Sequence, residues 1–256
     1  MRIEILEHAA AVAARAADRI EGAAMEAIAA RGRFAVALSG GRTPAAALAD
    51  LAVRDLAWER VHVFQVDERV APDGHADRNA GALRDLAERA GLPAGNLHLM
   101  PVADLDPEAA ARTYERTLQD TCGVPPVLDL VQLGLGDDGH TASLAPADPV
   151  LEVRDRDVAA TGVFRGRRRV TLTFPAIDRA REILWIVTGA AKAAAVRRLV
   201  AGDLSIPAGR VRTGDATLLL DAAAGREIAG LATGSRGKPG RSPAPRVVRS
   251  RGTPDA

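Results

Sequence analysis

Short apolar runs alternate with amphipathic helical patterns along most of the chain. The apolar runs are RFAVAL, VHVFQV, NLHLM, VLDLVQL, RRVTLTF, EILWIV and ATLLL, and a helical pattern follows most of them after a short loop. This order of strand, loop and helix is typical of parallel strands joined by crossover helices. The N-terminal stretch adds a short strand and an amphipathic helix. The sequence therefore predicts an α/β fold with a doubly wound, mainly parallel sheet of the Rossmann type and helices on both faces.

The composition indicates a core of small aliphatic side chains. Hydrophobic residues make up 47% of the 256 residues, but aromatic residues only 3%. A core of Ala, Val and Leu favours helices packed closely on a parallel sheet over a β-sandwich. A chain of this length can bury one sizeable core. We expect residues 1–231 to form a single α/β domain.

The last 25 residues differ from the rest of the chain. Residues 232–256 contain six Lys and Arg residues and one acid, Asp255, so subtracting their charge of +5 from the total of +1 leaves −4 for residues 1–231. An acidic body argues against nucleic-acid binding by the folded part. Because the tail is rich in Pro, Gly and Arg, we expect it to be disordered, either as a dispensable extension or as a weak polyanion-binding segment.

Cysteine usage and hydropathy bear on the compartment. Cys122 is the only cysteine, which excludes a disulfide within the chain and fits the reducing cytoplasm. No segment approaches the ~18 uninterrupted apolar residues of a membrane span. We therefore expect a cytoplasmic protein without membrane contact.

A first candidate for a ligand-binding loop is LSGGRTP. In doubly wound sheets, ligands bind outside the carboxyl ends of the strands, where loops lead into helices. Here Ser39, Gly40 and Gly41 follow a strand and permit close backbone approach, and Thr43 is suited to cap the next helix. Free N–H groups at such a helix start bind anions, most naturally phosphate. No Gly-Lys-Ser/Thr follows, so ATP is not expected, and an ordinary capped turn is the alternative.

A second candidate loop is VDERVAPDGH. Asp67, Glu68 and Arg69 stand where an apolar strand ends, so a carboxylate and a guanidinium are expected to face the cleft. A surface ion pair is the alternative. His75 lies in a polar turn and is expected to be solvated rather than catalytic.

A third candidate is Lys192, which follows the strand EILWIV. Of the 34 Lys and Arg residues only Lys192 and Lys238 are lysines, and Lys238 lies in the tail. A lysine near the first turn of a helix opposes the helix dipole, so a negative group is expected nearby. Its compact charge suits phosphate, although retention by chance is the alternative.

The fourth and longest candidate is LGLGDDGHTASLAP. Three glycines shape this loop, and His140 is expected at the start of the next helix. The positive end of a helix favours a neutral imidazole, which can accept a proton as a general base. Asp137 and Asp138 could instead bind a metal with His140, but no second His or Cys pair has ligand spacing, so no metal is expected. A merely structural loop is the remaining alternative.

Together these motifs resemble 6-phosphogluconolactonases. LSGGRTP, DERVAPDGHADRN, DLVQLGLGDDGHTASLAP, RRVTLTFPAI and IVTGAAKAAAVRRL occur in the order and at approximately the spacing of that family, over about residues 1–230. The block LGLGDDGHTASL is the most specific of them. The resemblance implies a NagB/RpiA-like α/β fold. It also implies hydrolysis of 6-phospho-D-glucono-1,5-lactone to 6-phospho-D-gluconate, the second step of the oxidative pentose phosphate pathway.

The resemblance also implies a role for each site residue. It makes His140 the catalytic base, with Asp67 and Asp138 as neighbouring polar support. Arg69 and Gly139 belong to the same cleft. The residues implied for the substrate phosphate are Ser39, Gly40, Gly41, Arg42, Thr43, Arg169 and Lys192. No cofactor is implied, and the substrate would come from glucose-6-phosphate dehydrogenase.

Two departures and two alternatives accompany the resemblance. The family block usually ends in Ser-Leu-Phe-Pro, whereas this chain has Ala145 before Pro146. Glucosamine-6-phosphate deaminases share the Asp-Gly-His element, but they carry a catalytic glutamate where this chain has Ala145. The basic tail is not part of the family pattern. A non-catalytic sugar-phosphate-sensing domain is the other alternative, although it would not explain both His140 and Asp67.

Overall fold

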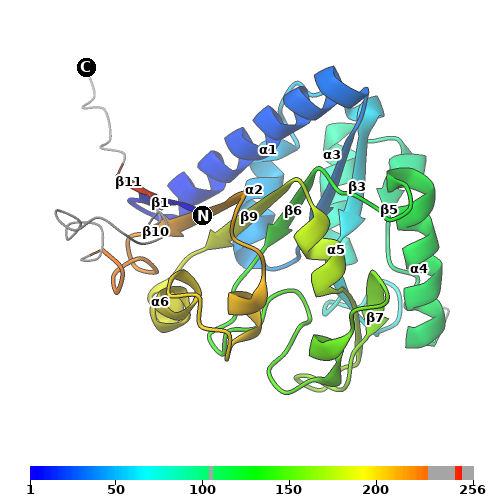
Figure 1. Cartoon of the computed structure of the whole chain (residues 1–256). Coiled ribbons are helices and arrows are strands. Elements are labelled where there is room, and N and C mark those ends of the chain that lie inside the picture. The colour runs from blue at the N-terminus through cyan, green and yellow to red at the C-terminus, as the bar shows by residue number, and fades with distance from the viewer. Residues whose placement is uncertain (104–105, 230–245, 250–256) are drawn as a thin grey trace.

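An eight-stranded sheet runs through the centre of the molecule (Figure 1). The computed structural model describes residues 1–103, 106–229 and 246–249. In spatial order the strands are β11 (Arg246–Arg249), β1 (Arg2–Leu6), β10 (Ala216–Asp221), β9 (Glu182–Val187), β6 (Leu130–Leu133), β2 (Phe34–Leu38), β3 (Val61–Gln65) and β5 (Leu97–His98). Every neighbouring pair is parallel, which confirms the predicted sheet.

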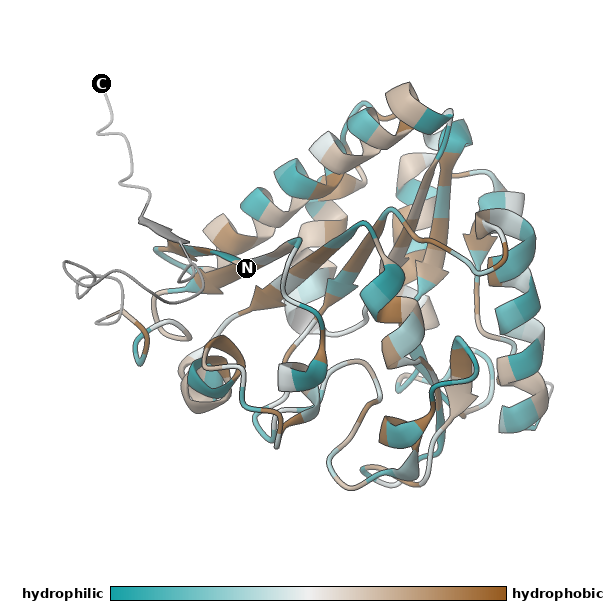
Figure 2. Cartoon of the chain, in the orientation of Figure 1, coloured by the Kyte–Doolittle hydropathy of each residue, from teal (hydrophilic) through white to brown (hydrophobic). Residues whose placement is uncertain are grey.

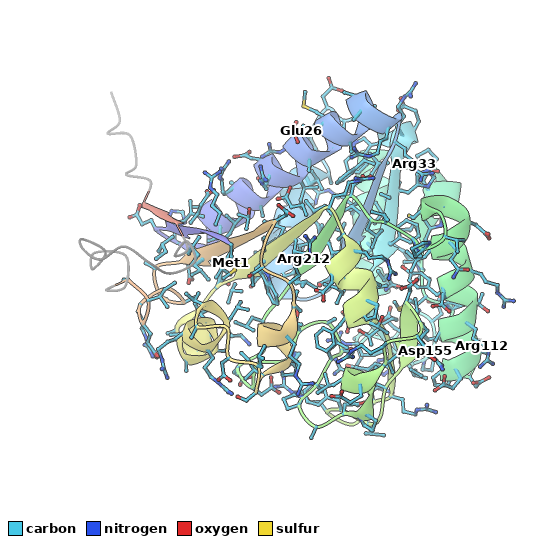
Figure 3. All side chains as sticks on the ribbon, in the orientation of Figure 1. Met1, Glu26, Arg33, Arg112, Asp155 and Arg212 are labelled. Carbon is cyan, nitrogen blue, oxygen red and sulfur yellow. The ribbon has the colours of Figure 1, made fainter. Side chains whose placement is uncertain are left out.

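Helices cover both faces of this sheet, as the sequence predicts. One face carries α1 (Ala9–Arg31), α2 (Arg42–Leu51) and α3 (Ala80–Ala90), and the other carries α4 (Pro107–Cys122), α5 (Phe174–Arg179) and α6 (Ala193–Val200). The short 3-10 turns are η1 (Trp58–Arg60), η2 (Ala94–Asn96), η3 (Pro149–Glu152), η4 (Ala190–Lys192) and η5 (Pro207–Arg210). Figure 2 shows brown, apolar strands between helices that carry teal, hydrophilic positions. In Figure 3 the side chains of Glu26 on α1 and Arg112 on α4 point away from the sheet.

Two apolar cores lie on the two faces of the sheet. In β2, Phe34, Val36 and Leu38 belong to the core beneath α1, α2 and α3, while Ala35 and Ala37 belong to the core beneath α4, α5 and α6. A parallel strand that is covered on both faces reads as a continuous apolar run, which explains FAVAL in the sequence. The buried face of α1 is mostly alanine. The low aromatic content therefore corresponds to close packing of small side chains.

The strand order reverses between β2 and β6. From β2 the chain proceeds to β3 and β5 on one side, then returns to place β6 on the other side of β2. Loops that leave two such neighbouring strands run in opposite directions and open a crevice at their carboxyl ends. Beyond the last paired residues of β2 and β6, Ser39 connects the two strands. Its N–H donates to Gln132 Oε1 (3.0 Å), and its hydroxyl donates to Gln132 O (2.8 Å). The fold therefore predicts a ligand site beside Ser39.

A second, antiparallel sheet lies beside the carboxyl end of β3. Its strand order is β4 (Asp67–Arg69), β8 (Arg169–Leu172) and β7 (Val158–Ala160). The sequence places RRVTLTF among the crossover strands of the parallel sheet, and this prediction is wrong for β8. Only Val66 separates β3 from β4, and its carbonyl accepts the N–H of Leu172, so the chain leaving β3 supplies the partner for β8.

No helix begins at His140, which corrects the sequence prediction. Residues 134–148 form turns around a bridge between Thr141 and Leu144, and only the short η3 follows. Glycines, Pro146 and Pro149 all disfavour a helix here, and the Thr141 hydroxyl bonds to the carbonyl of Gly134 within the loop. A helix dipole therefore cannot act on His140.

Four residues of the basic tail form a strand. Residues 230–245 and 250–256 lie outside the described residues, so the predicted disorder is untested there. Arg246–Arg249 form β11 and pair in parallel with β1. Their pairing satisfies backbone groups along one side of β1. Within the described part of the chain, no helix has both the length and the apolar character needed to cross a membrane.

We expect Tyr114→Phe to destabilise the fold by about 1–3 kcal/mol, because a buried hydroxyl bonded to backbone groups is lost. The Tyr114 hydroxyl accepts the N–H of Gln65 at 2.6 Å and lies within reach of the carbonyls of Gln65 (3.1 Å) and His98 (3.2 Å). Urea denaturation measures the loss. The control is Thr121→Val on the same helix, whose hydroxyl bonds to the Thr117 carbonyl. Equal losses in the two variants would contradict this account.

Candidate active site

The four candidate loops all follow carboxyl ends of parallel strands, as predicted. Residues 39–43 follow β2, residues 67–69 follow β3, residues 134–140 follow β6, and residues 188–192 follow β9. The hydroxyls of Thr43 and Thr188 lie 2.8 Å apart, so the first and the last of these loops meet. The sequence motifs therefore converge at one edge of the sheet.

His140 is held by a carboxylate two residues before it. Its Nδ1 lies 2.5 Å from Asp138 Oδ1, and its backbone N–H donates to the same oxygen at 3.1 Å. Burial raises the pKa of Asp138, but the hydrogen bonds from His140 and the charge of Arg165 outweigh burial and lower it. An ionised Asp138 accepts the Nδ1 hydrogen of a neutral imidazole, which leaves a lone pair on Nε2. Asp138, rather than a helix dipole, therefore fixes the orientation of the His140 ring.

Gly136 makes this arrangement possible. A side chain at residue 136 would overlap Nδ1 of His140 and Oδ1 of Asp138. The N–H of Gly136 donates to the carbonyl of His140 (2.8 Å), and the N–H of Gly139 donates to the carbonyl of Gly136 (3.1 Å). The loop thus folds back on itself tightly enough that only a glycine fits beneath the imidazole.

Asp67 and Arg169 meet at Ser143. The Ser143 hydroxyl donates to Asp67 Oδ2 at 2.5 Å, and Arg169 Nη1 donates to the same hydroxyl at 3.4 Å. Arg169 Nη1 also lies 4.0 Å from Asp67 Oδ2. Burial lowers the pKa of Arg169, and Asp67 partly offsets this effect. The structure thus places both predicted residues in a buried cluster that supports the loop after His140.

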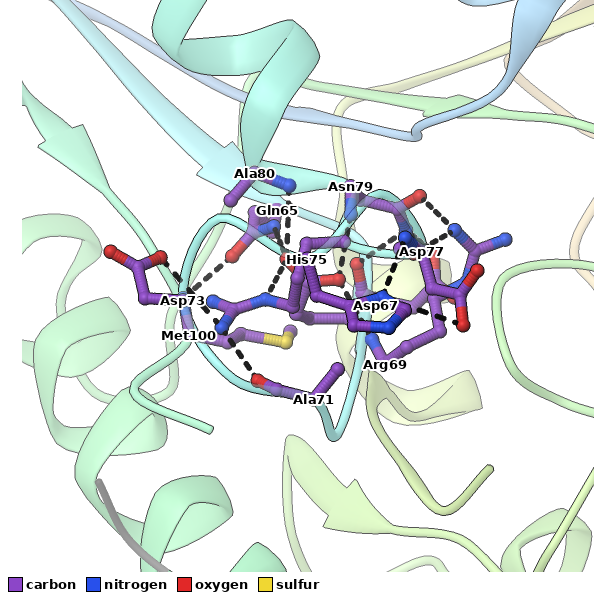
Figure 4. Close-up of polar contacts among 12 residues, drawn as sticks. Gln65, Asp67, Arg69, Ala71, Asp73, His75, Asp77, Asn79, Ala80 and Met100 are labelled. Atoms are coloured by element: carbon purple, nitrogen blue, oxygen red, sulfur yellow. Dashed lines mark hydrogen bonds and ion pairs between the residues drawn. The ribbon is translucent and has the colours of Figure 1, made fainter. Parts of the chain in front are cut away.

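A fully buried carboxylate, Glu68, organises the second candidate loop. Figure 4 shows residues of this loop and its surroundings, among them Gln65, Asn79 and Ala80. The Glu68 oxygens accept three backbone N–H groups, from Arg69 (2.8 Å), Asn79 (2.8 Å) and Ala80 (2.9 Å). The Gln65 side-chain amide donates to it at 2.9 Å, and Arg78 Nε forms an ion pair with it at 3.0 Å. This network fixes the start of α3 against the end of β3. The surface ion pair considered for this segment is therefore wrong for Glu68.

Asn79 connects this network to the loop after β2, which contains Gly40. Its Nδ2 donates to the Asp67 carbonyl (2.9 Å) and Oδ1 (3.2 Å), and its Oδ1 accepts from Arg69 Nη1 at 2.7 Å. A side chain at residue 40 would overlap the Asn79 amide. Gly40 therefore allows the loop after β2 to pack directly on Asn79, with Arg69 close by.

The loop after β2 leads into α2 two residues earlier than predicted. The helix begins at Arg42 with Gly41 as its N-cap, and Thr43 lies inside the first turn instead of capping it. Gly41 has no side chain to accept the first N–H groups, and the Thr43 hydroxyl is used to bond Thr188. The backbone of Arg42 is part of this start, but its side chain lies outside the described part of the structure.

Lys192 lies where the sequence predicts, at the end of η4 and immediately before α6. The expected negative group is Asp137, because Lys192 is one of the groups that lower its pKa, after hydrogen bonds from the backbone and from Arg165. The turn before Lys192 is held by Asp221 at the end of β10, whose oxygens each accept the Gly189 N–H at 3.0 Å. Lys192 is thus near enough to the His140 loop for its charge to act on Asp137.

Sequence reasoning missed several residues of this site. They are Asn79, Ser143, Phe164, Arg165, Thr188 and Asp221. Asp221 carried a signal, an acid ending an apolar strand, and Ser143 lies within the most specific block. Phe164 packs edge-on against His140, with ring centroids 5.1 Å apart, and nothing in its sequence neighbourhood marks it. In the described residues, no group of three or more His, Cys, Asp or Glu could hold a metal ion.

Comparison with known proteins gives the same relatives by sequence and by structure. The family model described as "Glucosamine-6-phosphate isomerases/6-phosphogluconolactonase" matches residues 7–220. The chain is 39% identical to a 6-phosphogluconolactonase of Nostoc sp. over 235 residues, covering 88% of this chain and 98% of that protein. For the 6-phosphogluconolactonase of Synechocystis sp. the identity is 42% over 213 residues, covering 79% and 88%. The 6-phosphogluconolactonase structure from Trypanosoma cruzi has a TM-score of 0.80 at 25% identity, covering 89% of this chain and 97% of that one. These findings confirm the resemblance that the motifs indicate.

We expect Glu68→Gln to destabilise the protein by about 3–5 kcal/mol, because it removes the charge that pairs with buried Arg78 and turns an amide N–H₂ toward backbone donors. Chemical denaturation measures the loss. Glu59→Gln is the matched control, since the Glu59 side chain is 69% exposed and its ion pair with Arg60 spans 4.0 Å. A Glu68→Gln variant as stable as Glu59→Gln would refute the role given to this carboxylate.

Proposed function

Because the chain belongs to the glucosamine-6-phosphate isomerase/6-phosphogluconolactonase family, we propose that it hydrolyses 6-phospho-D-glucono-1,5-lactone to 6-phospho-D-gluconate. The observation that carries this proposal is the Asp138–His140 pair, whose orientation leaves Nε2 to act as a base beside an anion-binding helix start. Its substrate would be the lactone that glucose-6-phosphate dehydrogenase releases. We further propose that residues 1–231 form one catalytic domain in the cytoplasm, in keeping with the unpaired Cys122.

The phosphate is proposed to bind at the start of α2. The N–H groups of residues 40–43 point from a helix N-terminus, which attracts anions. Lys192 adds a charge from the facing loop, and Thr188 ties that loop to Thr43. Arg69 donates to the Asn79 side chain, and that side chain packs against Gly40, so a guanidinium lies close to this loop. Arg169, which contacts Ser143 and Asp67, is better placed to hold the reacting end of the substrate than its phosphate.

The proposed reaction is general-base hydrolysis. Nε2 of neutral His140 removes a proton from a water molecule, whose oxygen attacks the lactone carbonyl carbon. The tetrahedral intermediate collapses by breaking the bond between that carbon and the ring oxygen, and the imidazolium returns its proton to the departing oxygen. Asp138 stabilises the imidazolium through Nδ1. Binding of the phosphate would hold the lactone carbonyl in a fixed orientation to the base, so that the attack becomes effectively unimolecular.

Deamination of glucosamine 6-phosphate is the less favoured activity of the same family. The glutamate that deaminases carry after their Asp-Gly-His element corresponds to Ala145, a buried residue without a titratable group. Incubation with glucosamine 6-phosphate should therefore release no ammonia. Ammonia release at a rate comparable to lactone hydrolysis would replace our proposal with the deaminase assignment.

A coupled assay tests the proposed function directly. Glucose-6-phosphate dehydrogenase generates the lactone, and its disappearance is followed with and without the protein. We expect acceleration over spontaneous opening, and a loss of about 10²–10⁴-fold in His140→Ala, the usual contribution of a general base. Phosphate-analogue binding by this variant should persist, because the phosphate contacts lie on other loops. A fully active His140→Ala variant would refute the assignment of the base.

We expect Gly136→Ala to lower kcat by about 100-fold, since a displacement of roughly 1 Å in a catalytic group has that cost. The added methyl group overlaps His140 and Asp138, so the loop must move. Gly134→Ala, two residues earlier, is the matched control, because a methyl group there meets no atom within 4 Å. Similar kcat values in the two variants would show that the close approach at Gly136 is not needed.

A further inference from the structure

The connection between β7 and β8 ends in a tight turn beside the His140 loop. Phe164 and Arg167 pair as an isolated bridge, and between them Arg165 and Gly166 have φ values of 51° and 80°. Two successive left-handed residues are the mark of a type I′ turn, where Asn and Gly are preferred. Arginine in this conformation carries a steric cost. A residue that is kept at such a cost usually has a function. Here that function would belong to the arginine side chain, because Asn or Gly would suit the turn better but would lack the guanidinium.

Three contacts hold this turn over the site. Arg167 donates to Asp77 Oδ2 at 2.8 Å on one side. Phe164 packs on the imidazole of His140, and Arg165 Nη2 donates to Asp137 Oδ1 at 3.2 Å on the other side. The turn therefore bridges the loop that precedes α3 and the loop that carries the base.

Arg165 also reaches the carboxylate that orients His140. Its Nη2 lies 3.7 Å from Asp138 Oδ2, while Asp138 Oδ1 is bonded to His140 Nδ1 at 2.5 Å. The two oxygens of one carboxylate thus face a cation and the imidazole. A carboxylate whose charge is shared with a guanidinium stabilises an imidazolium less than a free one does, and the guanidinium itself repels that imidazolium.

We propose that Arg165 is a positioning residue for the hydrolysis: it holds Asp138 and weakens the stabilisation of the imidazolium form of His140, which keeps the base available at lower pH. This inference rests on the proposed function of His140. Arg165 touches neither reacting atom, and it acts through Asp138. Its side chain is 57% exposed, so solvent reduces the effect to a modest one.

The other charged groups around the pair come from separate elements. Arg169 of β8 lies over the Phe164 ring at 5.0 Å, Lys192 of η4 acts on Asp137, and Asp67 of β4 is bonded to Ser143. All of these contacts remain when Arg165 alone is replaced. Asp137, without its guanidinium partner, would also favour the imidazolium. Removal of Arg165 should therefore shift the protonation of His140 in one direction, so that the imidazole takes up its proton at higher pH.

The test is the pH dependence of kcat/KM in Arg165→Asn. Asparagine suits the left-handed turn position, so the charge is removed without loss of the turn. We expect the acid limb of the profile to move to higher pH by about 0.2–0.7 units, the range available to a partly exposed ion pair. Arg165→Lys, which retains a cation, should return the limb toward its original position.

Arg167→Gln is the matched control from the same turn. It removes a cation that pairs with Asp77 rather than with Asp138, so the acid limb should not move. A limb that stays in place in Arg165→Asn, or that moves equally in Arg167→Gln, would overturn the proposal. A uniform rise in KM at every pH would overturn it as well, because Arg165 would then be a substrate ligand.

An NMR titration separates this inference from the proposed function. The chain has five histidines, and the signal lost in His140→Ala identifies the ring of interest. In the absence of substrate, its change in chemical shift should occur at higher pH in Arg165→Asn than in the unmodified protein. A protein without lactonase activity that still shows this difference would refute the function and its positioning role, and would retain only the electrostatic effect of Arg165 on His140. If the enzyme is active but the His140 signal titrates at the same pH in Arg165→Asn and in the unmodified protein, the function is supported and the inference is refuted.

Discussion

The arrangement of the candidate site depends on the groups that balance the buried charge of Glu68. The Glu68 carboxylate has no exposed surface, so protein donors must replace all of its water. Three of the donors are backbone N–H groups, two of them at the start of α3, and the others belong to Gln65 and Arg78. These bonds fix the path of the chain from β3 through β4 to α3. That path sets Asn79 beside the loop after β2 and Asp67 beside Ser143, so the buried charge helps to set where the loops proposed for the phosphate and for the base lie relative to each other.

The topology assigns separate tasks to neighbouring strands. The strand order reverses between β2 and β6, and the loop after β2 leads into the helix start proposed for the phosphate, while the loop after β6 carries the proposed base. Ser39 and Gln132 hold the two strands together up to the point where their loops separate. Binding and chemistry are thus carried by rigid, adjacent strand ends, and the longer β7–β8 connection adds contacts from outside the main sheet.

The sequence predicts the features that arise from local patterns. Alternating apolar runs and helical patterns were sufficient for the parallel sheet, for the helices on both faces, and for His140, Asp138 and Lys192 at strand ends. The remainder depends on contacts between distant segments. The β8 run has the same apolar character as a central strand, and only the short β4 decides that it pairs in a second sheet. The contact of Phe164 with His140 likewise arises only when residues 24 positions apart are brought together by the fold.

The pairing of β11 with β1 has a consequence for the behaviour of the protein at high concentration. A parallel sheet that ended at β1 would present a five-residue row of open backbone groups, a template on which a second molecule could add its own strand. The chain covers this row with a segment of its own, Arg246–Arg249. The opposite border, β5, is only two residues long. Neither side of the sheet therefore offers a long apolar strand for intermolecular association.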